Sequence, residues 1–86
     1  MRGKLMNIKV RLFAAQREAT GQSSCDIELP PGARAGDALE AICVRFPQLR
    51  ASSASVVLAV NQSQTSADAL LADGDELALL PPMAGG

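Results

Sequence analysis

The 86-residue sequence predicts a single α+β domain in which one main helix covers one face of a sheet of four to five strands. Segments of alternating apolar and polar residues, typical of half-buried strands, stand on both sides of one segment with helical apolar spacing. These segments are mixed along the chain and do not alternate regularly. No internal repeat and no change in composition divides the chain into two domains.

Two segments before the main helix alternate between apolar and polar residues, at 6–12 and 24–29. Between them, residues 14–20 are good helix formers, and Gly21 is a natural left-handed C-cap. The sequence therefore predicts strand, short helix, strand, with a turn at 30–32 after the second strand. The residues expected to face the core are Met6, Ile8, Val10, Leu12, Cys25, Ile27 and Leu29.

An apolar stripe with the spacing i, i+3, i+4, i+7 predicts the main helix at about 37–46. Asp37 stands in the first turn, where an acid binds free amides and complements the helix dipole. Pro47 ends the helix. The stripe consists of Leu39, Ile42, Cys43 and Phe46.

The remaining strands are short. After a loop at 51–55, the apolar run at 56–60 suits an interior strand, and 64–65 suits a brief edge strand beyond a turn at 61–62. The last strand is expected at 76–80, after a turn at 73–75. The acids around that turn lack the length and the distal glutamate of a calcium loop, so we expect a turn and no metal site.

Composition excludes several classes of function. The chain has no His, Trp or Tyr and two Phe, which excludes imidazole acid–base chemistry, His-ligated metals and extensive stacking on bases. Its net charge of −1 and pI of about 5.2 give no global attraction for nucleic acid. All Lys and Arg residues lie in 1–50, while 51–86 carries only acids, so the acidic half could meet a basic partner surface.

The cysteines and the N-terminal segment indicate a cytoplasmic protein. Cys25 and Cys43 do not form a zinc or redox motif, and each is expected to be a small buried residue in a reducing compartment, with a disulfide as the alternative. The longest apolar run, 56–60, is too short for a membrane span. Polar residues interrupt the start of the chain where a signal peptide would be apolar, so no signal peptide is expected. The regular pattern begins at Met6, so residues 1–5 are expected to be a disordered extension or to precede the true start of the protein.

The last six residues form the most informative segment. Two prolines end the last strand and start an extended arm of roughly 20 Å. A glycine pair can enter a slot too narrow for any Cβ. The only reactive group there is the α-carboxylate, which is ionised and a poor electrophile, so its chemistry requires activation by another enzyme. The arm consists of Pro81, Pro82, Met83, Ala84, Gly85 and Gly86.

Several motifs stand in a specific order. They are AVN at 59–61, DGDE at 73–76 and PPMAGG at 81–86, preceded by FA at 13–14, RE at 17–18 and LPPGA at 29–33. Together they resemble the small sulfur-carrier subunits of molybdopterin synthase over nearly the whole chain from Met6. The chain departs from that family at Leu79 and Leu80, since aromatic residues are common there just before the prolines, and at Gln64, a position that is often apolar in the family.

The resemblance implies a β-grasp, ubiquitin-like fold with a mixed sheet over 1–80 and a flexible tail at 81–86. It implies a sulfur-donating small subunit, not an enzyme on its own, in a heterotetrameric synthase. A ubiquitin-activating-type adenylyltransferase would use ATP to adenylate Gly86, and sulfur would convert it to a thiocarboxylate. The tail would enter the large catalytic subunit, which builds the dithiolene of molybdopterin from cyclic pyranopterin monophosphate. No permanently bound cofactor is implied.

Strand parity predicts a partner surface. If Leu12 faces the helix, Phe13 faces away, and Leu80 does likewise on the last strand. In the β-grasp arrangement these two strands are neighbours, so Phe13 and Leu80 are expected to lie together on the uncovered sheet face as a docking patch. Scattered surface hydrophobic residues are the alternative interpretation.

Three other functions remain open. The first is a sulfur carrier for thiamine thiazole synthesis, although the resemblance implies that such carriers are shorter and lack the helix at 14–20. The second is a ubiquitin-like modifier conjugated to lysines through Gly86. The third is an interaction domain whose tail is dispensable.

Overall fold

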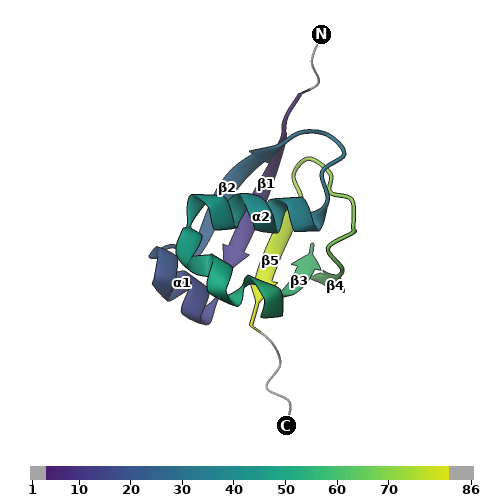
Figure 1. Cartoon of the computed structure of the whole chain (residues 1–86). Helices are drawn as coiled ribbons and strands as arrows, with labels where there is room; N and C mark the ends of the chain where they lie inside the picture. The colour runs from purple at the N-terminus through teal and green to yellow at the C-terminus, as the bar shows by residue number, and fades with distance from the viewer. Residues whose placement is uncertain (1–3, 82–86) are drawn as a thin grey trace.

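The computed structural model describes residues 4–81, apart from the side chains of Ser52 and Ala54. Two helices, one 3₁₀ helix and five strands follow one another along the chain (Figure 1). Their bounds are β1 Met6–Leu12, α1 Ala14–Thr20, β2 Ser24–Leu29, α2 Ala35–Arg45, η1 Pro47–Ser55, β3 Val57–Val60, β4 Ser63–Thr65 and β5 Glu76–Leu80.

The five strands form one mixed sheet in the order β2-β1-β5-β3-β4. The central pair, β1 and β5, is parallel, and every other pair is antiparallel. Helix α2 crosses one face of this sheet (Figure 1). The predicted α+β architecture, the brief edge strand and the bounds of the last strand are therefore confirmed.

The core lies between the sheet and α2. Strand β1 alternates strictly between buried and exposed residues, because its even-numbered side chains face the helix. The predicted inward residues of β1 and β2 are all buried, and Ile42 and Cys43 of the helical stripe face them. The largest fully buried side chains are Ile8, Val10, Leu12, Ile42, Cys43, Leu77 and Leu79.

The predicted turns are also confirmed. Gly21 closes α1 with φ +74°, and its N–H donates to the Arg17 carbonyl at 2.8 Å. Between β3 and β4, Asn61 and Gln62 both take positive φ values of 51° and 73°, which suits a tight hairpin turn.

The main helix begins two residues earlier than predicted, at Ala35. The reason is tertiary: the N–H groups of Ala35 and Gly36 donate to the carbonyls of Ala69 and Ala67, at 2.8 and 2.9 Å. A distant loop thus binds amides that a helix start leaves free. Asp37 acts as expected, since its carboxylate accepts the backbone N–H of Arg34 at 2.8 Å.

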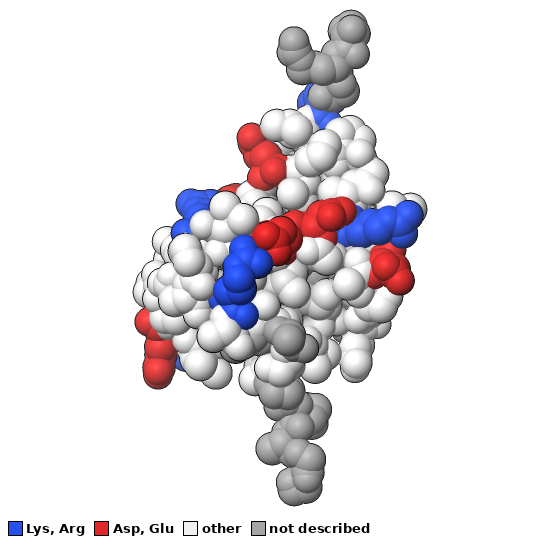
Figure 2. Space-filling model, in the orientation of Figure 1, with Lys and Arg blue, Asp and Glu red and all other residues white. Residues whose placement is uncertain are grey.

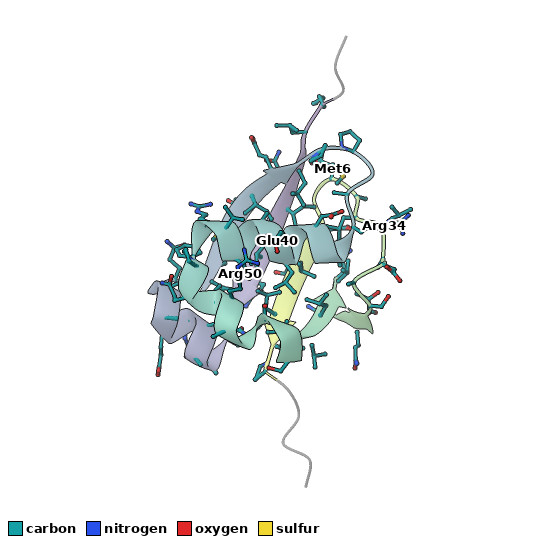
Figure 3. All side chains as sticks on the ribbon, in the orientation of Figure 1. Met6, Arg34, Glu40 and Arg50 are labelled. Carbon is teal, nitrogen blue, oxygen red and sulfur yellow. The ribbon has the colours of Figure 1, made fainter. Side chains whose placement is uncertain are left out.

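The predicted loop at 51–55 is wrong, because these residues belong to η1 and the following strand begins at Val57. Pro47 starts this 3₁₀ helix, and buried Leu49 anchors it to the core. The Arg50 guanidinium binds both carboxylate oxygens of Glu40 on α2, at 2.9 and 3.0 Å (Figure 3). This pairing lowers the pKa of the Glu40 carboxyl and ties η1 to α2.

Cys25 and Cys43 are both buried and free, as expected for small apolar residues. Burial raises the pKa of the Cys25 thiol, since the apolar surroundings disfavour the thiolate. Within residues 4–81, no helix is long and apolar enough to cross a membrane.

Candidate functional site

The candidate site lies where β5 ends. Strand β5 pairs with β1 on one side and β3 on the other, so the end of the chain departs from the middle of the sheet. Pro81 follows β5 and is exposed. The remaining predicted tail residues, Pro82, Met83, Ala84, Gly85 and Gly86, lie outside the described residues.

The strand register defines the sheet face that α2 leaves uncovered. Ala78 pairs with Arg11 on β1, and Leu80 pairs with Val57 on β3. Phe13 follows directly after β1 in an extended conformation, which continues the alternation and sets it beside Leu80. Phe13, Val57, Ala78 and Leu80 are each half-buried, and we call them the open-face patch. The predicted proximity of Phe13 and Leu80 agrees with this register.

Arg11 borders the open-face patch. Its guanidinium lies 5.8 Å from the centroid of the Phe13 ring and binds the Glu76 carboxylate at 3.1 Å. Both members of the ion pair are partly exposed, so the pair contributes little to stability. It gives the apolar patch a polar rim, which is the usual anatomy of a docking surface.

The acids near β5 serve the turn that precedes the strand. Asp73 accepts the Asn7 backbone N–H at 2.7 Å, and Asp75 accepts the Ala72 N–H at 2.8 Å and the Asn61 side-chain amide at 3.0 Å. These bonds explain the DGD sequence as a turn motif. Among residues 4–81, no cluster of three or more His, Cys, Asp or Glu side chains could hold a metal ion.

A hollow of about 110 Å³ lies beside Pro81, between the start of α1 and the end of η1. Phe13, Gln16 and Val56 contribute to its wall. The chain turns into α1 through Ala14, whose φ of +50° is uncommon for a residue with a Cβ. Figure 1 shows that α1 and the end of β5 lie at the same end of the molecule.

Sequence reasoning missed this hollow and its buried polar residue, Gln16. Helix α1 has no apolar residue larger than alanine, so no stripe marks its buried side. The signal that could have found it is a glutamine three residues after the predicted docking residue Phe13, preceded by two alanines.

Charge is distributed unevenly on the helix-covered side of the molecule. Figure 2 shows acidic and basic side chains across the middle of this side, whereas the surface around the end of β5 is largely uncharged. The end of β5 is thus suited to contacts with an apolar partner surface.

Sequence comparison connects this arrangement with known proteins. The model of the ThiS family matches residues 10–86. The molybdopterin synthase sulfur carrier subunit of Arabidopsis thaliana is 38% identical, over 94% of this chain and 84% of the relative. The protein of the same name from Aedes aegypti is 39% identical, over 96% and 92% of the two chains.

Solved structures with a similar fold include proteins of the same kind as the sequence relatives, and they identify the type of fold. A putative molybdopterin converting factor subunit 1 from Pyrococcus furiosus superposes with a TM-score of 0.82 at 35% identity, covering 91% of this chain and 99% of that one. The H. volcanii small archaeal modifier protein 1 gives 0.85 at 27%, with the same coverage. These neighbours are ubiquitin-like β-grasp proteins, as the predicted fold requires.

One neighbour was solved with a partner. The complex of subunits 1 and 2 of the molybdopterin-converting factor from Helicobacter pylori contains a chain with a TM-score of 0.64 and 27% identity, covering 94% of this chain and 100% of that one.

Proposed function

Because this chain belongs to the ThiS family, we propose that it is the sulfur carrier subunit of a molybdopterin synthase. The main support for this proposal is that two features lie at the same end of the fold. The central strand β5 ends in the apolar open-face patch, and the family match continues from that strand through Gly86. A carrier needs a rigid body that partners can bind and an end that they can reach.

The chemistry belongs to Gly86. Its carboxylate attacks the α-phosphorus of ATP and displaces pyrophosphate, which yields an acyl adenylate. Sulfur delivered at the sulfide level then displaces AMP and leaves a thiocarboxylate, a stronger nucleophile than the carboxylate. In this proposal the chain acts as the carrier, and partner enzymes catalyse both steps.

Two partners follow from this role. A ubiquitin-activating-type adenylyltransferase uses ATP to activate Gly86. The large catalytic subunit receives the tail and transfers the sulfur to cyclic pyranopterin monophosphate. The complex of the Helicobacter pylori neighbour supports a large-subunit partner. In our proposal the open-face patch docks on that subunit, and the segment from Pro81 to Gly85 passes through a narrow slot to the reaction centre.

A second candidate function is favoured by one observation, the TM-score of 0.85 to a small archaeal modifier protein. A modifier would use the same activated Gly86 but join it to an amine of another protein. The two functions share the adenylate and differ in the nucleophile that displaces AMP.

One experiment separates them. The full chain is incubated with the activating enzyme of the same organism, ATP and a sulfur donor, and its intact mass is measured. A sulfur carrier gains the mass difference between sulfur and oxygen and then restores molybdopterin formation by the large subunit. A modifier instead gives adducts on denaturing gels that resist thiol reductants.

The matched control is a chain that lacks only Gly86. It is expected to keep the unfolding midpoint of the full chain and to accept no sulfur. Sulfur transfer at the full rate without Gly86 would overturn the proposed function.

A further inference from the structure

The hollow beside Pro81 has a mostly apolar wall. Its volume is about 110 Å³, and no charged residue lines it. Water in such a hollow finds few partners in the wall, so an apolar group that displaces this water gains free energy. Two neutral polar residues complete a lining whose apolar members are Phe13, Ala14, Ala15, Val56 and Pro81.

The backbone beside the hollow has an uncommon conformation. Ala14 has φ +50°, in the left-handed region that glycine adopts at the least cost. A residue of this kind persists only where the surrounding structure holds it, and such residues are concentrated at binding sites. The turn at Ala14 leads the chain from β1 into α1 and so forms one side of the hollow. The strained turn and the apolar wall are two separate signs of a binding surface.

We propose that the hollow receives one apolar side chain of the large subunit, namely a leucine, an isoleucine or a methionine. This inference rests on the proposed function, because it takes the large subunit as the protein that covers the open-face patch. The bound side chain extends that interface around the end of the sheet.

Two residues of the wall favour the large subunit as the source of this side chain. Phe13 contributes both to the hollow and to the open-face patch, so a protein that covers the patch also reaches the edge of the hollow. Pro81 forms another part of the wall, and five residues follow it up to Gly86. At about 3.3 Å for each residue they span about 17 Å, so a subunit that acts on Gly86 must approach the hollow.

The volume and the lining restrict the bound side chain. A cavity of roughly 150 Å³ holds the six carbons of benzene, so about 110 Å³ accommodates about four heavy atoms. Leucine, isoleucine and methionine each have four heavy atoms beyond Cα, whereas aromatic side chains are larger. A lysine or arginine head group would lose its hydration here without gaining a counter-charge.

The test uses substitutions on two different segments of the wall, each with a matched control. Ala15→Met adds a side chain that can occupy the hollow, and Ala19→Met adds the same side chain at an exposed position of α1 outside the lining. Val56→Thr keeps the shape of the side chain and adds a hydroxyl. Its control is Val44→Thr on α2, where the valine is 65% exposed.

For each full-length variant, affinity for the purified large subunit of the same organism is measured by calorimetry at several temperatures. Urea unfolding of the free variants shows that each one is folded.

We expect both wall variants to bind the large subunit at least about tenfold more weakly than the unmodified chain. Ala15→Met fills the space that the partner's side chain needs, so the heat-capacity change of binding should also become less negative. Val56→Thr places a hydroxyl against that apolar side chain, where the hydroxyl loses its water. The controls Ala19→Met and Val44→Thr should bind as tightly as the unmodified chain.

Two results would overturn the inference. Unchanged affinity of Ala15→Met would mean that no side chain enters the hollow in the complex. Weaker binding of Ala15→Met together with unchanged binding of Val56→Thr would mean that the added methionine only obstructs the surface of α1. In both cases the unmodified chain still binds the large subunit and accepts sulfur, so the proposed function stands. If the unmodified chain itself does not bind the large subunit, the proposed function fails, and the inference fails with it.

Discussion

Strand β5 presents two different faces to its surroundings. Leu77 and Leu79 point toward α2 and are 0% and 1% exposed, whereas Ala78 and Leu80 point away and stay half-buried. Four consecutive apolar residues therefore divide between two environments by parity alone. An interior strand of one sheet contributes to the core on one side and offers contact surface on the other.

This division separates stability from recognition. A change on the covered face removes contacts that every folded molecule makes. A change on the open-face patch alters contacts that form only when a partner docks. The two faces should therefore respond in different assays to the same substitution, and the following experiments test that expectation.

The largest effect is expected on the covered face. Replacing Leu77 with alanine should lower the free energy of unfolding by about 3 kcal/mol, because it opens a cavity under α2 that the packed core cannot close. Urea unfolding followed by circular dichroism measures the loss.

The same substitution at Leu80 is the matched control. Because that side chain is only half-buried, alanine there should cost less than about 1 kcal/mol. Equal losses at the two positions would show that the open-face patch is part of the structural core.

The next effect, Leu80→Asp, is expected to be smaller in free energy and to appear in binding: it should lower the affinity for the large subunit. A carboxylate in the open-face patch would be desolvated when the large subunit docks, so the affinity should fall by at least about tenfold. The control is Leu70→Asp in the loop before β5, where a leucine is already 63% exposed. If the two variants bound the large subunit with equal affinity, the open-face patch would not be part of the interface.

The smallest effect concerns pH. Burial raises the pKa of the Cys25 thiol in the folded chain, so the folded state holds this proton more tightly than the unfolded state does. The resulting stability is complete below the ordinary thiol pKa of about 8.5 and declines as the pH rises from there toward the folded value.

Urea midpoints across this alkaline range would measure the decline. Cys25→Ala should flatten the slope, whatever cavity it creates, because only the slope reports the titration. An unchanged slope would assign the alkaline loss of stability to other groups.

Much of the fold follows from local patterns. Strict alternation identified β1 and β2 and their buried residues, and the parity of Phe13 and Leu80 led to the open-face patch. These features depend on the two-residue period of a strand, which tertiary contacts do not alter.

Other features depend on distant contacts. At the start of α2, the N–H groups of Ala35 and Gly36 donate to carbonyls of Ala69 and Ala67, and the local signal, Asp37, does not reveal this distant contact. Residues 51–55 look like a serine-rich loop but continue a 3₁₀ helix held at Leu49 and Arg50. Burial of Gln16 likewise results from packing between α1 and η1, so its amide looks like an ordinary surface group in the sequence.

The central place of β5 has a mechanical consequence. Tension applied at Pro81 runs along a strand that is bonded on both edges, to β1 and to β3. Those hydrogen bonds lie across the direction of pull, so they are loaded together in shear and do not open one after another as at a free sheet edge. A partner enzyme could therefore bind and pull on the end of the chain while the domain stays folded.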